Sequence, residues 1–190
     1  FAADVKIPVE KLAMVVNNSL ASRERGSFAA SPVRIVKAEE KPADFHARFD
    51  SKGKKYIYRI LNAESADVFV RNYVYHVAKP LDTDAMRRAA EYLKGTHDFK
   101  SFEAAGGTPR ETTVRTIYDI SVIGDRNIKI HVSGDGFLYN MVRIITGTLT
   151  DIGAGKIAPE QMKAIIDAAD RSAAGHTAPP YGLYLAEVYY

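Results

Sequence analysis

The sequence contains no cysteine in 190 residues, and this absence removes several kinds of chemistry at once. Disulfide bonds, thiolate metal sites and cysteine nucleophiles are excluded. A chain without cysteine fits a cytoplasmic protein better than a secreted one, so we expect a cytoplasmic location. No apolar run approaches the roughly 20 residues of a transmembrane helix. We therefore expect no membrane-spanning segment in these residues and no membrane partner.

Signatures of metal and nucleotide cofactors are lacking too. The five histidines are scattered, and no two of them have the spacing of zinc ligands. Gly-Asp-Gly at 134–136 and Gly-Ala-Gly at 153–155 do not form the six-residue glycine pattern that binds phosphates at the start of a helix. Nothing singles out a Ser-His-Asp triad, although none is excluded. The residues themselves therefore point to no metal site.

The composition that remains is that of a globular protein. Hydrophobic residues make up 46% of the chain and aromatic residues 10%, which is ordinary for a packed core. The net charge of +3 and the pI near 9.0 suit a polyanionic partner without requiring one. The length fits one domain, or one domain with a small lobe. The chain begins at Phe1 without a methionine, which leads us to expect a fragment or a processed protein.

Helices and strands are both expected, without a strict alternation between them. The spacing of apolar residues predicts helices at 8–20, 83–93, 98–103, 137–152 and 159–169. Alternating apolar and polar residues predict strands at 33–38, 54–61, 114–123 and 127–133, the last two forming a hairpin. Residues 182–190 carry apolar side chains on both faces, so we expect a well-buried closing strand. The pattern is typical of an α+β protein with a mostly antiparallel sheet flanked by helices.

The stretch 45–59, FHARFDSKGKKYIYR, interleaves cations with aromatic residues. Its single acid is Asp50, and its cations are Arg48, Lys52, Lys54, Lys55 and Arg59. Cations neutralise phosphates and aromatic faces stack on unpaired bases, so the stretch is suited to RNA. The alternative is an ordinary solvated strand edge guarded by lysines, and composition alone leaves it open.

The stretch 136–152, GFLYNMVRIITGTLTDI, places one cation in an apolar helical pattern. A guanidinium among apolar neighbours is unfavourable unless it has a partner, so Arg143 is a candidate functional residue. Equally, its stem could cover apolar surface while its head reaches water. Gly147 weakens a helix interior by about 1 kcal/mol relative to alanine, which indicates that another group approaches closely there.

A third stretch, 176–185, has the sequence HTAPPYGLYL. Two prolines stiffen it, and Gly182 permits a turn into the last strand. By itself the stretch is most simply a loop that feeds a buried strand.

Taken in order, four segments resemble one family. They are FHARFDSKGKKYIYRI at 45–60, GTHDFKSFEAAG at 95–106, GFLYNMVRIITGTLTDIGAGK at 136–156 and APPYGLYLAEVYY at 178–190. The family is the TruA type of tRNA pseudouridine synthase, an isomerase that converts uridines in the tRNA anticodon arm to pseudouridine. Four ordered motifs make the resemblance specific, and 5–40 fits it less closely. It implies a pseudouridine synthase-like α+β fold, with 1–190 as the C-terminal portion of the catalytic domain.

The resemblance also implies roles for particular residues. Tyr56, in the KKY motif, would contact the target uracil, and Leu183 would help to build the apolar wall of the pocket. Arg143, in the MVR motif, would pair with the catalytic aspartate. The tRNA backbone would be held by Arg48, Lys52, Lys54, Lys55, Arg110 and Arg115. The family uses no metal or organic cofactor and acts as a homodimer that shares one tRNA across both subunits.

The chain departs from the family pattern in ways that bear on activity. The family's nucleophile lies in an Arg-Thr-Asp-Ala-Gly-Val-His motif, which is absent from these 190 residues. In the family that motif precedes the position matching Phe1, so we expect a missing N-terminal segment and predict that the 190 residues alone are inactive. The loop at 21–31 is longer than the family's short turn, and Ile144 stands where the family usually carries asparagine. These two changes affect loop conformation and local hydrogen bonding rather than the assignment.

Two other interpretations stay open on the sequence. The absent aspartate and the basic aromatic strand also fit a stand-alone RNA-binding module without chemistry. Tyrosine-rich strands at 73–75 and 181–190 also fit a structural dimerisation domain. An upstream Arg-Thr-Asp-Ala-Gly motif would eliminate the first interpretation. Tight, salt-sensitive tRNA binding would count against the second.

Overall fold

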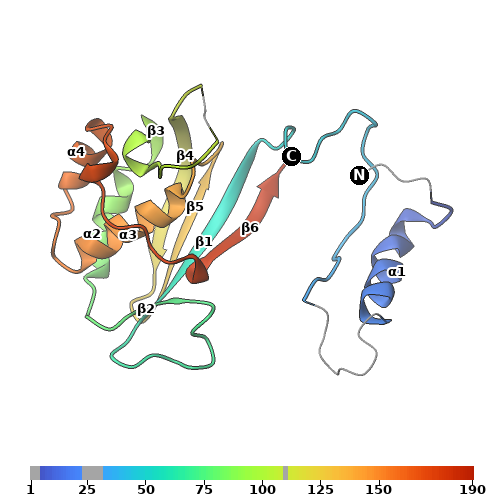
Figure 1. Cartoon of the computed structure of the whole chain (residues 1–190), viewed down its shortest axis with the longest axis horizontal. Helices are drawn as coiled ribbons and strands as arrows, with labels where there is room; N and C mark the ends of the chain where they lie inside the picture. The colour runs from blue at the N-terminus through green and yellow to red at the C-terminus, as the bar shows by residue number, and fades with distance from the viewer. Residues whose placement is uncertain (1–4, 23–31, 109–110) are drawn as a thin grey trace. The chain divides into compact units, whose positions relative to one another are not determined.

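A computed structural model describes residues 5–22, 32–108 and 111–190 of the chain. These residues belong to two compact units, with the boundary between Asp50 and Ser51. Figure 1 traces both units, and the second contains every strand among the described residues. None of the helices in these ranges has the length and apolar character needed to cross a bilayer.

The first unit contains helix α1, Val9–Ser22, and an extended segment that follows it. The helix confirms the prediction for 8–20. The strand predicted at 33–38 is wrong, because the backbone there bonds to a side chain of the helix. Asn17 accepts a hydrogen bond from the amide of Ile35 and donates one to the Ile35 carbonyl oxygen, both at 2.8 Å. Alternation predicts a strand only where a neighbouring strand supplies the ladder.

The second unit is built on a six-stranded sheet in the order β2-β1-β5-β4-β3, with β6 also paired to β1. The strands are β1 Gly53–Asn62, β2 Tyr75–Val77, β3 Gly95–Asp98, β4 Val114–Ile123, β5 Asn127–Gly134 and β6 Leu183–Tyr189. Every pairing is antiparallel except that of β1 with β2. The predicted α+β class, the mostly antiparallel sheet and the hairpin of β4 with β5 are therefore confirmed.

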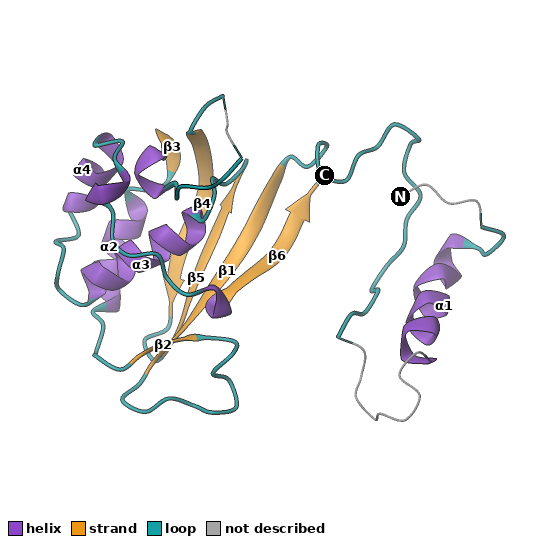
Figure 2. Cartoon of the chain, in the orientation of Figure 1, coloured by secondary structure: helices purple, strands orange, loops and turns teal. Residues whose placement is uncertain are grey.

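Three helices cover one face of this sheet, as Figure 2 shows. They are α2 Thr83–Glu91, α3 Met141–Gly153 and α4 Gln161–Asp167. Their apolar side chains and those of the strands form one buried core, in which Met86, Ile130 and Ile144 are completely inaccessible. Helix α3 begins later than the predicted 137, because Asn140 has a φ of 60°, a left-handed conformation that does not continue a helix.

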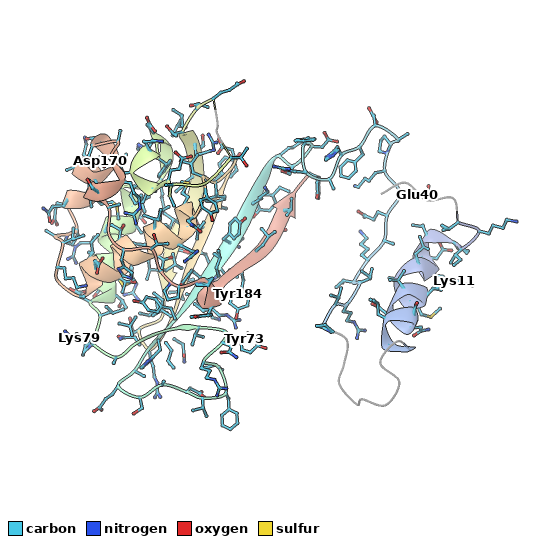
Figure 3. All side chains as sticks on the ribbon, viewed as in Figure 1. Lys11, Glu40, Tyr73, Lys79, Asp170 and Tyr184 are labelled. Carbon is cyan, nitrogen blue, oxygen red and sulfur yellow. The ribbon has the colours of Figure 1, made fainter. Side chains whose placement is uncertain are left out.

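The last strand differs most from its prediction. β6 was expected to be well buried, but Leu185 is 54% exposed. The reason is its place in the sheet, since β6 pairs only with β1 among the described residues. Tyr184 also ties β6 to the segment before β2, because its hydroxyl donates to the carbonyl oxygen of Tyr73 at 2.7 Å (Figure 3). Strand β3 was not predicted, and β2 overlaps the tyrosine-rich strand expected at 73–75 only at Tyr75; both are too short to show alternation.

Candidate active site

Arg143 lies in the first turn of α3 and is held by the segment that precedes the last strand. Its Nε donates to the carbonyl oxygen of Ala178 at 2.7 Å, and its Nη1 donates to the Oδ1 of Asn140 at 2.9 Å. The amide of Ala178 returns a hydrogen bond to the carbonyl oxygen of Arg143 at 3.1 Å. The side chain is partly buried. The guanidinium is therefore fixed against the protein rather than extended into water.

The guanidinium of Arg143 has no anionic partner within the described residues. None of the ion pairs formed there includes it, and both of its acceptors are neutral oxygens. Its Nη2 makes no hydrogen bond to any residue of the described ranges. A partly buried cation gains most from a carboxylate that meets its remaining N–H donors. Arg143 thus has donors available for an anion from outside these ranges.

Tyr58 bonds to the residue next to the one that accepts from Arg143, and the sequence analysis did not single it out. Its side chain is completely buried, and its hydroxyl donates to the carbonyl oxygen of Pro179 at 2.5 Å. Burial raises the pKa of Tyr58, Tyr75 raises it further, and the positive charge of Arg143 opposes both. The hydroxyl therefore stays protonated and acts as a donor. The sequence could have pointed to Tyr58, because it lies two residues after Tyr56 and therefore on the same face of the strand.

Tyr56 and Leu183 face the same side of the sheet as Tyr58. Tyr56 lies two residues before Tyr58 on β1, and Leu183 lies opposite Tyr58 in the ladder of β1 with β6. The ring of Tyr56 packs edge-on against Phe137, with 5.1 Å between the ring centroids. Burial raises the pKa of Tyr56, so its hydroxyl is neutral. The structure therefore brings Tyr56, Leu183 and Arg143 to one side of the sheet, around Tyr58.

The second unit has two hollows. One, of about 550 Å³, is lined by 62–65 and 125–126. The other, of about 280 Å³, is lined by residues of 61–76 together with Pro179 and Tyr181. Neither hollow is lined by the residues predicted to contact uracil or the catalytic aspartate. Among the residues described, no three His, Asp or Glu side chains are grouped so that they could hold a metal ion.

The cations predicted to bind RNA are spread over several elements. Arg48 belongs to the first unit, where its guanidinium lies 5.6 Å from the centroid of the Phe49 ring. Lys54 and Lys55 are neighbours on β1, so their side chains point to opposite faces of the sheet. Lys54 shares the face of Tyr56, whereas Lys55 lies on the other face.

Two of the remaining predicted cations, Lys52 and Arg115, lie at or next to the ends of strands. Lys52 precedes β1, and its amide donates to the carbonyl oxygen of Tyr189 at 2.8 Å. Arg115, on β4, donates from Nη1 to the carbonyl oxygen of Thr112 at 3.0 Å and lies beside Gly136. Arg110 lies outside the described residues.

Comparison with known proteins identifies the family. A family profile described as tRNA pseudouridine synthase matches residues 89–190, which is more than half of the chain. The chain belongs to this family. It is similar to tRNA pseudouridine synthase A 2 of Clostridium perfringens, at 53% identity over 157 residues, and to that of Clostridium tetani, at 45% over 185 residues. It is also 46% identical over 192 residues to tRNA pseudouridine synthase A of Ruminiclostridium cellulolyticum.

The matches cover more of this chain than of its relatives. They include 82%, 97% and 100% of the chain, but 64%, 71% and 74% of the respective relatives. The resemblance to TruA-type tRNA pseudouridine synthases, which are isomerases, is therefore confirmed, and so is the fold that it implied. The matched region includes β4, β5, α3 and β6, and therefore both Arg143 and Leu183.

Proposed function

We propose that the protein containing these 190 residues isomerises uridine to pseudouridine in the anticodon arm of tRNA. The reaction breaks the bond between C1′ of the ribose and N1 of the base, turns the base, and joins C1′ to C5. The proton on C5 leaves and N1 takes up a proton, so no atom is gained or lost overall. Because these atoms are inaccessible in a base stack, the enzyme must first take the uridine out of it.

Arg143 carries this proposal. Its guanidinium is partly buried and held by two neutral oxygens, and its Nη2 is bonded to no described residue. A carboxylate that attacks a nucleotide must be ionised, and an adjacent guanidinium lowers the pKa of that carboxylate. Arg143 therefore pairs with the catalytic aspartate of the family's Arg-Thr-Asp-Ala-Gly-Val-His motif, which these 190 residues do not contain.

Tyr56 and Leu183 supply the contacts to the uracil. The phenol of Tyr56 is kept neutral by burial, so its hydroxyl can donate or accept a hydrogen bond while its ring offers a face to the base. Leu183 presents an aliphatic side chain from the adjacent strand. Because both side chains lie on the side of the sheet that bears Arg143, one flipped base can meet all three.

Cations hold the tRNA backbone, and the protein works as a cytoplasmic homodimer that shares one tRNA between its subunits. Phosphate contacts release counterions, so tRNA binding weakens as the salt concentration rises. The proposed contacts are those of Arg48, Lys52, Lys54, Lys55, Arg110 and Arg115. The net charge of +3 supports a polyanionic partner.

The test is release of tritium from tRNA labelled at C5 of uridine, because that hydrogen leaves during the reaction. The protein that joins these residues to the aspartate motif should release tritium. Its Arg143→Ala variant should be slower by roughly 100- to 1000-fold, because removing one partner of a buried pair leaves the other charge uncompensated. Arg87→Ala is the matched control, since Arg87 is a partly exposed arginine that is paired with Asp84 and Asp125 rather than held for an outside anion. Normal turnover by the Arg143 variant would remove Arg143 from this role.

A second candidate, RNA binding without chemistry, is favoured by the absence of the aspartate motif from these 190 residues. The same assay separates the two. The 190-residue chain alone should release no tritium at any concentration, whereas the longer protein should. Salt-sensitive tRNA binding by a longer protein that never releases tritium would establish the binding module instead.

A further inference from the structure

Residues 174–179, here called the strap, run along one face of α3. Arg143, Gly147 and Asp151 are spaced by four residues, so they share that face. At the first position, Ala178 exchanges hydrogen bonds with Arg143. At the second, the carbonyl of His176 lies so close that a Cβ on Gly147 would be 1.7 Å from its oxygen. At the third, His176 bonds to Asp151.

Asp151 anchors the strap. Its side chain is 11% exposed, and its Oδ2 accepts hydrogen bonds from the backbone amide of His176 at 3.2 Å and from the ring Nδ1 at 2.9 Å. Its Oδ1 accepts one from the Nζ of Lys156 at 2.7 Å. Burial raises the pKa of Asp151, but the hydrogen bonds from Lys156 and His176 outweigh burial and hold that pKa below its usual value. The carboxylate is therefore ionised and can only accept hydrogen bonds.

The ionised carboxylate fixes the imidazole of His176. Because Asp151 has no proton to donate, the Nδ1 of His176 must carry the proton. The Nε2 of a neutral ring is then an acceptor, and the hydroxyl of Tyr75 on β2 lies 3.2 Å from it. The ring of His176 is thus held from both sides, by α3 and by the sheet.

We propose that His176 is a positioning residue for Arg143 and acts through the strap. Thr177 alone separates His176 from Ala178, whose carbonyl oxygen accepts the hydrogen bond from Arg143 Nε at 2.7 Å. A displacement of His176 therefore moves that acceptor directly. On the far side of Ala178, the buried hydroxyl of Tyr58 holds the carbonyl of Pro179. The acceptor is fixed between two side chains, and the direction of the Arg143 guanidinium follows from it.

The functional consequence rests on the proposed function. With Nε and one N–H of Nη1 bonded to Ala178 and Asn140, the side of the Arg143 guanidinium that bears Nη2 is left to meet the catalytic aspartate. Its place is defined only as well as that of the two acceptors. Loosening the strap should therefore slow the chemical step more than it weakens the binding of tRNA, whose backbone is held elsewhere.

Other contacts keep the strap attached when the His176 ring is removed. Thr148 Oγ1 accepts from the amide of Gly175 at 3.0 Å. Arg171 donates to the carbonyl oxygen of Gly175 and to the Oγ1 of Thr177, each at 3.0 Å. A His176→Ala variant should therefore fold, with a strap that is mobile rather than detached.

The first test follows the Nε–H resonance of Arg143 by NMR in the 190-residue chain and does not depend on catalysis. In His176→Ala, this hydrogen should exchange with solvent about tenfold faster, the factor expected when one typical hydrogen bond is lost. His176→Asn should restore slow exchange, because its side-chain N–H can still reach Asp151. His97→Ala is the control, since it removes an imidazole that bonds to the Lys94 carbonyl oxygen at 2.8 Å. Unchanged exchange in a folded His176→Ala chain would overturn the proposal.

Should His176→Ala fail to fold, Tyr75→Phe removes only the hydroxyl at Nε2. It should accelerate the same exchange by a smaller factor, and an unchanged rate would again overturn the proposal.

The second test measures tritium release by the longer protein, in which His176→Ala should lower kcat about tenfold and leave KM within about twofold. A rise in KM with kcat unchanged would exclude a positioning role for His176. If the longer wild-type protein releases no tritium, the proposed function is refuted. The exchange rate of the Arg143 Nε–H still decides the role of His176 in that case.

Discussion

Arg143 and Ala178 hold each other through both backbone and side chain. The Nε of Arg143 donates to the carbonyl oxygen of Ala178 at 2.7 Å, and the amide of Ala178 donates to the carbonyl oxygen of Arg143 at 3.1 Å. This reciprocal contact joins the helix of the motif at 136–156 to the loop that begins the motif at 178–190. It places the cation of α3 next to the segment that leads into β6.

Replacing Arg143 with lysine should separate charge from geometry. Arg143→Lys keeps the positive charge, but one ammonium group does not reproduce a planar fork that bonds two oxygens and still offers donors to a third. We expect kcat/KM for tritium release to fall by roughly 10- to 100-fold while the chain remains folded. Unfolding curves provide the check on stability. Activity within twofold of wild type would show that charge alone suffices.

Replacing Gly147 with alanine should detach the strap. The new Cβ would lie 1.7 Å from the carbonyl oxygen of His176 and 2.7 Å from its carbon, and both are backbone atoms that do not move easily. We expect a loss of about 3 kcal/mol or more in the free energy of unfolding, despite the better helix propensity of alanine. Urea unfolding measures it. Gly136→Ala is the control, because its Cβ would meet only the Arg115 side chain at 3.4 Å.

His131 should make stability depend on pH. Burial lowers the pKa of His131 below its ordinary 6.5, Lys55 and Lys129 lower it further, and Asp119 opposes them. Because the unfolded chain then binds the proton more readily, the free energy of unfolding should fall as pH drops below about 6.5. His131→Gln should lose less stability between pH 8 and pH 5 than wild type does. Equal losses in the two proteins would mean that His131 is not responsible.

Lys54 and Lys55 offer a test of which face of the sheet meets RNA. They are adjacent on β1 and point to opposite faces, with Lys54 on the face of Tyr56. Lys54→Gln should reduce the slope of log K against log salt concentration by about 1 for tRNA binding, as expected for one lost phosphate contact. Lys55→Gln tests the opposite face in the same way, and Lys163→Gln on α4 serves as the control. A larger effect of Lys55 would place the RNA on the opposite face.

Long, regular elements were predicted well. The helices at 83–93 and 137–152 and the strands at 54–61, 114–123 and 127–133 correspond to α2, α3, β1, β4 and β5 with ends shifted by a few residues. Periodicity over eight or more residues is a strong signal, because each repeat separately indicates the same buried face. The close approach expected at Gly147 is also confirmed, although the approaching group is the chain's own His176.

The errors occurred where the partner, and not the local pattern, decides the structure. The segment 33–38 alternates like a strand, yet Asn17 takes the backbone bonds of Ile35. Residues 183–189 are apolar on both faces like a buried strand, yet β6 has β1 on one side only among the described residues. In both places the local pattern is that of a strand, but a neighbouring strand that such a pattern needs is absent from the described residues.

The sequence by itself determined the fold class, the position of most elements and the family, because periodicity and ordered motifs are written along the chain. It also singled out Arg143 as a cation in an apolar helix. Only the tertiary structure decided what holds that cation. Ala178 lies 35 positions away and His176 contacts α3 through Asp151. Hydrogen bonds between distant segments depend on how helix, strap and sheet pack in three dimensions, and no local pattern records that packing.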